Sequence, residues 1–162
     1  LDRTLEGAFV AGPVTHPDLL QTVVFREELV LVSAPGLTVS ELLQARDLKA
    51  MVLRAGCSYR ARLEAVLAAR GRPTVRLVEF GSLDAILGCV AAGIGVTLLP
   101  RAVVQAAATA SRVALHALPP REAMVETLFV RRGDGLMTSA LAVFLDCAGA
   151  PQAGSATALA AE

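Results

Sequence analysis

Apolar residues occur along the chain in short runs separated by glycine, proline and polar residues. The clearest example is "GSLDAILGCVAAGIGVTLLP" (81–100), where apolar residues first recur at helical spacing and then form a continuous run. Ser82 is placed to cap the helix and Gly93 to end it, and Gly95 lets the chain turn. The pattern predicts a buried helix followed by a buried strand that stops at Pro100.

Similar strands and helices are predicted on both sides of this unit. In "TVSELLQARD", Thr38 and Glu41 have the spacing of a capping box, and in "SYRARLEAVLAARGRP" Gly71 is placed to end a helix. Further helices are predicted over 101–108 and in "MTSALAVFLDCA". The runs that predict the other strands are 5–13, 22–36, 48–56, 74–80, "RVALHALP" and "VETLFVRR".

This alternation of strands and helices predicts an α/β domain with a largely parallel sheet. Ligands of such sheets bind at the carboxyl ends of strands, beside the N-termini of helices. Two strand-to-helix junctions have that character, at 55–60 and at 80–83. The glycines of Gly93-Ile94-Gly95 follow a helix instead of preceding one, so we interpret them as a turn and not as a phosphate-binding loop.

Composition narrows the classes of function. The chain has 162 residues, 54% hydrophobic and 19% charged, which is enough apolar material for a sizeable core. Its formal net charge of zero argues against a surface built to bind nucleic acid or an anionic membrane. The longest uncharged run, 85–100, is shorter than the ~20 residues of a spanning helix. With no signal peptide in front of the domain, we expect a cytoplasmic protein.

The cysteines and histidines give little sign of metal, redox or catalytic chemistry. Cys57, Cys89 and Cys147 are far apart and odd in number, and His16 and His116 stand alone, so we expect no metal and no cofactor. Cys57 precedes a helix start, which allows three interpretations: a reactive thiol, part of an anion site, or a small packed residue. A nucleophile needs a base and a redox sensor a resolving cysteine, and neither is evident. We therefore expect no enzyme, and Cys89 and Cys147 in the core.

An ordered series of segments resembles the effector-binding domain of LysR-type transcriptional regulators. The resemblance covers about residues 5–148, and Glu6 stands where that family more often has Asp. The segments that carry it are "LEGAFVAGP", "EELVLV", "GCSYR", "EFGSLDAIL", "VAAGIGVTLLPR" and "TLFVRR".

The resemblance implies a two-lobed fold like that of periplasmic binding proteins, with mostly parallel sheets and a small effector in the cleft. Lobe two would span 35–120, and an incomplete lobe one would combine 1–34 with 121–148, followed by a loose tail at 149–162. The family's helix-turn-helix and the first part of lobe one are expected to precede Leu1, which is not a Met. DNA would then be bound only through that missing segment, and a homo-oligomer is expected.

The two helix-start junctions supply most of the expected ligand contacts. If Ser58 begins a helix, its hydroxyl and the first N–H groups are placed to hold a carboxylate, and Arg60 or Arg54 would add charge. The alternative is that the serines only cap helices and that the arginines are solvated. Glu27 and Glu28 are expected at a surface edge. The complete set of candidate ligand-binding residues is Gly12, Pro13, Gly56, Cys57, Ser58, Tyr59, Arg60, Gly81, Ser82 and Thr97.

The favoured function is the small-molecule sensing domain of a LysR-type regulator. The effector, a carboxylate or other small anion, would favour one arrangement of the lobes and so change the oligomer that carries the DNA-binding arms. A stand-alone solute-binding module of the same fold is the alternative, since fold alone does not separate the two. A cysteine enzyme is the third hypothesis.

Overall fold

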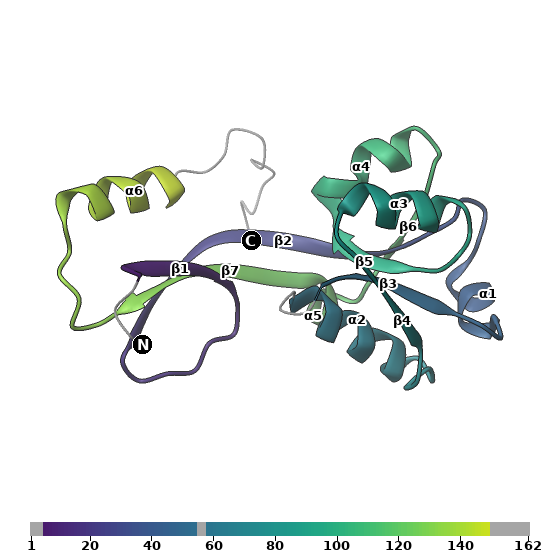
Figure 1. Ribbon diagram of the computed structural model, residues 1–162, viewed down its shortest axis with the longest axis horizontal. Coiled ribbons are helices and arrows are strands. Elements are labelled where there is room, and N and C mark those ends of the chain that lie inside the picture. Colours follow the sequence, from purple (N-terminus) through teal and green to yellow (C-terminus); the bar gives the residue numbers. More distant parts are fainter. Residues whose placement is uncertain (1–4, 55–57, 150–162) are drawn as a thin grey trace, which may run out of the picture. The chain divides into compact units, whose positions relative to one another are not determined.

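The computed structural model describes residues 5–54 and 58–149 (Figure 1). The described chain divides into two compact units: unit 1 contains 5–26 and 126–149, and unit 2 is Glu27–Val125. Both divisions fall inside long strands, β2 (Leu19–Ser33) and β7 (Met124–Arg132), and not in the loops near 34 and 120 where the sequence analysis placed them. The predicted tail lies, from residue 150 on, outside the described residues.

The elements follow the predicted order, with one added turn of helix before the last strand. That turn is α5 (Pro120–Ala123). The other elements, besides β2 and β7, are β1 (Gly7–Ala11), α1 (Val39–Gln44), β3 (Lys49–Leu53), α2 (Ser58–Ala69), β4 (Arg76–Phe80), α3 (Leu83–Ala91), β5 (Thr97–Pro100), α4 (Arg101–Thr109), β6 (Ala114–Ala117) and α6 (Ser139–Gly149).

Three local signals in the sequence are confirmed. Thr38 and Glu41 form the complete capping box of α1. The hydroxyl of Ser82 accepts a hydrogen bond from the backbone N–H of Ala85 and so caps α3. Gly71 follows α2 with φ +83°, the left-handed conformation that ends helices.

The strands of unit 2 run in both directions. β3 and β4 are parallel, and β3 is also bridged in parallel to Val96, the residue before β5. In contrast, the second half of β2 is antiparallel to both β5 and β6. The expectation of mostly parallel strands therefore holds where helices connect β3, β4 and β5. It is wrong around β2, which enters the sheet in the opposite direction, and in unit 1, where β1 and β7 are antiparallel.

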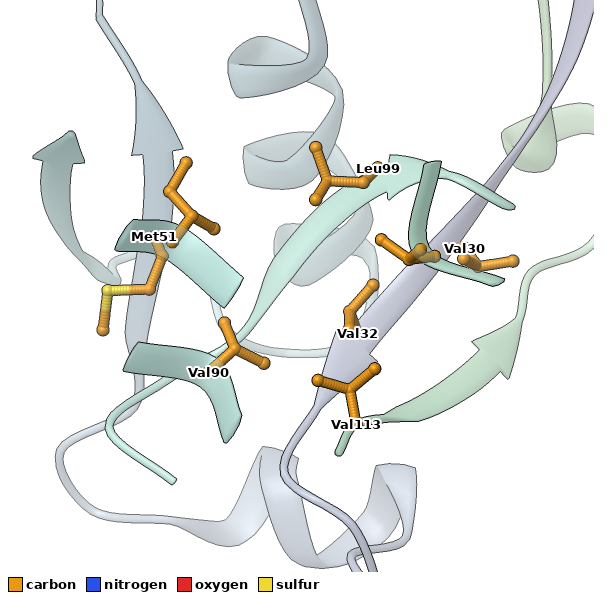
Figure 2. Packing of buried hydrophobic residues seen from close by; sticks show 8 residues of the cluster. Val30, Val32, Met51, Val90, Leu99 and Val113 are labelled. Atoms are coloured by element: carbon orange, nitrogen blue, oxygen red, sulfur yellow. The ribbon is translucent and has the colours of Figure 1, made fainter. Parts of the chain in front are cut away.

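Side chains that alternate along the strands of unit 2 divide its core between two faces. One face is buried beneath α3 and α4, and Figure 2 shows its side chains converging. The other face packs against α2, which contacts β3 and β5. Figure 1 shows this layering within unit 2. The buried residues on the side of α3 and α4, from the strands and from the segments that cover them, are Val30, Val32, Met51, Ile86, Val90, Leu99, Val104 and Val113.

Unit 1 contains a cluster of packed phenylalanine rings, one of which comes from helix α6. The ring centroid of Phe9 lies 5.4 Å from that of Phe129 and 5.9 Å from that of Phe144. Leu141 of α6 is buried, whereas Cys147 on the same helix is exposed. The expectation that Cys147 lies in the core is therefore wrong, because it does not share the buried side of α6. Cys89 of α3 is half-buried and packs against the core of unit 2.

Candidate functional site

The two predicted junctions lie at one edge of the sheet in unit 2. The parallel strands β3 and β4 end side by side, since Leu53 pairs with Phe80 in register. Arg54 and Gly81 are the next residues, and helices α2 and α3 begin shortly after them. Helix starts beyond the carboxyl ends of parallel strands are where α/β sheets bind ligands. The structure thus brings together residues that the sequence analysis considered separately.

At the first junction, side chains of α2 bind to neighbouring strands. The hydroxyl of Tyr59 donates a hydrogen bond of 2.9 Å to Glu27 Oε2 on β2. Arg60 forms an ion pair with Glu79 of β4. Both contacts hold the first turn of α2 against the sheet. Ser58, the first residue of α2, is exposed, whereas Gly56 and Cys57 lie outside the described residues.

At the second junction, Gly81 makes room for Arg54. A Cβ atom on Gly81 would lie only 2.7 Å from Arg54 Nη2, so the guanidinium group occupies the space of the missing side chain. Ser82 is exposed at the N-terminus of α3, where its hydroxyl oxygen accepts the capping hydrogen bond. The predicted capping role is therefore confirmed. The contact between Arg54 and Gly81 was missed, because only the register of β3 and β4 produces it.

Thr97 is buried behind this edge instead of open to a ligand. The residue is only 2% exposed, and its hydroxyl donates a 2.8 Å hydrogen bond to the carbonyl oxygen of Met51. Tyr59, Arg60 and Thr97 together line a cavity of about 10 Å³. That volume holds roughly one water molecule. A small organic ligand at this edge would therefore contact the exposed rim of the junctions and not this cavity.

Gly12 and Pro13 follow β1 in unit 1, so they belong to a different unit from the other candidates. The backbone N–H of Gly12 donates a 2.8 Å hydrogen bond to the carbonyl oxygen of Glu126 on β7. A Cβ atom on Gly12 would lie 3.1 Å from Leu128 Cδ1, which explains the small residue there. The observed role of Gly12 is thus close packing of β1 against β7.

Glu27 and Glu28, expected at a surface edge, each have a partner side chain on another element that the sequence analysis did not predict. Both are half-buried, and Arg101 donates two hydrogen bonds of 2.7 Å to the carboxylate of Glu28. These hydrogen bonds from the guanidinium lower the pKa of Glu28 below its usual value. The pair forms because Leu29 and Pro100 are partners in the antiparallel ladder, which the sequence alone does not reveal.

His116 of β6 is a half-buried titratable group of unit 2. Its Nε2 lies 2.8 Å from Oγ of Ser33, which is fully buried at the end of β2. Burial lowers the pKa of His116. Within residues 5–54 and 58–149, no three His, Cys, Asp or Glu side chains are grouped so that they could hold a metal ion. No helix in this same part of the chain is long and apolar enough to cross a bilayer.

The comparison with known families decides what kind of domain carries this site. The family described as "LysR substrate binding domain" matches residues 1–151. The chain belongs to this family. The resemblance noted in the sequence is therefore confirmed.

Relatives of this LysR substrate-binding domain are transcriptional regulators. The chain is 44% identical over 146 residues to the HTH-type transcriptional regulator GltR of Bacillus subtilis (strain 168), covering 90% of this chain and 49% of the relative. It is 36% identical over 146 residues to the HTH-type transcriptional regulator SoxR of Arthrobacter sp. (strain TE1826), covering 90% of this chain and 50% of that protein. The chain thus spans about half the length of these relatives.

Solved regulatory domains share the fold of this chain. The regulatory domain of NMB2055 (MetR) from N. meningitidis matches with a TM-score of 0.74 at 14% identity, covering 89% of this chain and 71% of that one. The regulatory domain of CcmR from Synechocystis PCC6803, in complex with 2-PG, matches with a TM-score of 0.72 at 17% identity, covering 92% and 74%. The expected fold, like that of periplasmic binding proteins, is confirmed.

Proposed function

We propose that this chain is the effector-sensing domain of a LysR-type transcriptional regulator, acting in the cytoplasm and without enzymatic activity. The relatives that it matches are regulators, and two domains that share its fold, the regulatory domain of CcmR and the effector-binding domain of QuiR, were solved in complex with 2-PG and shikimate, respectively. The observation that carries the proposal is the shared edge of unit 2. There, two parallel strands end in register and two helices begin.

The proposed effector site consists of the exposed residues at this edge, supported by side chains beneath them. Ser58, Gly81 and Ser82 are exposed and available for contact. Tyr59 and Arg60 hold the first turn of α2 through Glu27 and Glu79, so their role is to position the backbone N–H groups of that turn. Thr97, with its hydroxyl bound to the sheet, supports the floor. Gly12, Pro13, Gly56 and Cys57 stay ligand contacts predicted from the sequence alone.

The proposed mechanism is a shift in conformational populations. An effector that binds one arrangement of the domain more tightly than another shifts the population towards that arrangement. The size of the shift is limited by the difference between the two binding free energies. In a homo-oligomer, this shift changes the spacing of DNA-binding segments. The relatives GltR and SoxR are named HTH-type regulators, and the chain spans about half the length of each.

Two measurements test the proposal. In a thermal-shift screen of small metabolites against the 162-residue chain, a sensor domain is stabilised in a concentration-dependent way by at least one compound, because ligand binding to the folded state alone raises its stability. In cells, deletion of the coding segment changes the level of a small set of transcripts. A chain that no compound stabilises, and whose deletion leaves the transcripts unchanged, contradicts the proposal.

A further inference from the structure

Arg54 and Gly81 are neighbours at the edge of the sheet, although 27 positions of sequence separate them. Each follows directly on a strand, and the last residues of those strands, Leu53 and Phe80, are paired in register. The guanidinium group of Arg54 lies on the side of Gly81 from which a side chain would project. Its Nη2, Cζ and Nε atoms lie 2.7, 3.5 and 3.6 Å from the position that a Cβ atom on Gly81 would take.

The absence of a side chain on Gly81 thus gives the guanidinium its position. Gly81 has no positive φ, so its backbone does not require glycine. The three atoms nearest to its missing Cβ all belong to the end of the Arg54 side chain, which is flexible. A methyl group at position 81 would therefore move the guanidinium while leaving the strands in place. The close approach of the Arg54 guanidinium therefore explains why position 81 is a glycine, although the backbone conformation there does not require one.

Arg54 also differs from the other arginines near the site in its charge balance. Arg60 is paired with Glu79, and Arg101 with Glu28. For Arg54, no carboxylate within the described residues lies at ion-pair distance, and its side chain is exposed. Its charge is therefore uncompensated at the edge where ligands of this fold class bind. Glu79 is bound to Arg60 and does not pair with the guanidinium group of Arg54.

We infer that Arg54 is the specificity-determining residue of the effector site, and that its ligand carries a carboxylate, sulfate or phosphate group. This inference rests on the proposed function. A guanidinium offers two parallel N–H donors that match the oxygens of such groups. With Gly81 beneath it, the group is held on the side of the edge where Ser82 starts α3, whose first N–H groups also favour an anion.

The test compares four variants of the 162-residue chain with the wild type. Arg54→Gln removes the charge, Arg54→Lys keeps the charge but not the two-donor geometry, and Gly81→Ala displaces the guanidinium. Arg46→Gln is the matched control, since Arg46 is also an exposed arginine but lies in the loop before β3, outside the site. Apparent Kd values are measured by titration with sodium malonate and with sodium sulfate at constant ionic strength, and glucose serves as the neutral probe.

We expect Arg54→Gln to weaken binding of the anions by roughly tenfold or more, since a hydrogen bond to a charged group is lost. Gly81→Ala and Arg54→Lys weaken binding by about 3- to 10-fold, because charge remains while geometry is lost. Arg46→Gln leaves the Kd unchanged. The urea midpoint of Gly81→Ala stays at the wild-type value, which excludes unfolding as the cause.

The outcomes separate this inference from the proposed function. Equal anion affinity in wild type and Arg54→Gln overturns the role of Arg54, and so does an equal loss in Arg54→Gln and Arg46→Gln. Stabilisation of the wild type by neutral compounds alone overturns the anionic ligand class but leaves the sensing function standing. A wild-type chain that binds no small molecule overturns both.

Discussion

Among the glycines of unit 2 that the structure describes, Gly95 is the position where one added methyl group should destabilise the fold most. Its missing Cβ would lie 2.3 Å from the carbonyl oxygen of Lys49 and 2.6 Å from Met51 Cε. The next residue, Val96, exchanges two hydrogen bonds with β3, of 2.7 Å to the N–H of Met51 and 2.9 Å to the carbonyl oxygen of Lys49. Gly95 therefore lies where two backbones touch, and Gly95→Ala would push them apart.

The magnitude follows from the displacement required. An ordinary contact begins near 3.4 Å, so the backbone at Lys49 or Gly95 must move by about 1 Å. Such a movement lengthens both hydrogen bonds of Val96 beyond useful range, at about 0.5–1.5 kcal/mol each. Crowding of the fully buried Met51 adds about 1–3 kcal/mol. We expect a total loss of about 2–6 kcal/mol, a large share of the stability of a typical domain.

Gly88→Ala is the matched control for the same chemical change. Gly88 lies inside helix α3, is exposed, and has no atom within 4 Å of its missing Cβ. The substitution should stabilise the chain by about 0.5–1 kcal/mol, since alanine favours the helix and restricts the unfolded state.

Urea unfolding followed by circular dichroism measures both variants. At an unchanged slope, a lower midpoint for Gly95→Ala and a higher midpoint for Gly88→Ala report the two effects directly. The reasoning is refuted if Gly95→Ala unfolds within about 0.5 kcal/mol of the wild type, which is the usual range of harmless surface changes. That result would mean that β3 and the segment before β5 do not approach as closely as the structure shows.

Two further predictions concern the charged and titratable groups of the chain. Arg101→Gln should cost roughly 1 kcal/mol at pH 7, because the pair with Glu28 is bidentate but its side chains are 37% and 40% exposed. Because Arg101 lowers the folded-state pKa of Glu28, this stability is present above the ordinary carboxyl pKa of 4.5 and is lost as the pH falls through the lower folded pKa. The urea midpoints of wild type and variant should therefore converge in acid, and a constant difference contradicts this reasoning. Arg26→Gln, which breaks a more exposed pair (68% and 48%), should cost less than about 0.5 kcal/mol and is the control. Because burial lowers the pKa of His116, the folded chain resists its protonation, and wild-type stability should fall as the pH drops below 6.5 towards the lower folded pKa. His116→Gln should reduce this fall between pH 7.5 and 5.5, and an identical pH dependence in the variant would show that His116 is not its source.

Candidate site residues could be identified from sequence only where they belong to a local pattern. The position of Ser82 before an apolar helical run predicted its capping role, which the structure confirms. The partners of Tyr59 and Arg60 could not be predicted, since Glu27 and Glu79 belong to other strands. The same holds for Thr97, whose hydroxyl is bound to the backbone of β3.

The sequence by itself determined the elements and their order, apart from the short helix α5. The capping box of Thr38 and the stop at Gly71 depend on hydrogen bonds and backbone angles of residues within a few positions of each other, so spacing along the chain is sufficient to predict them. The tertiary structure alone decided the direction of β2, the contact of Arg54 with Gly81 and the close approach at Gly95. These features depend on strand register, which is set by the burial of side chains from distant segments against each other and leaves no local signature in the chain.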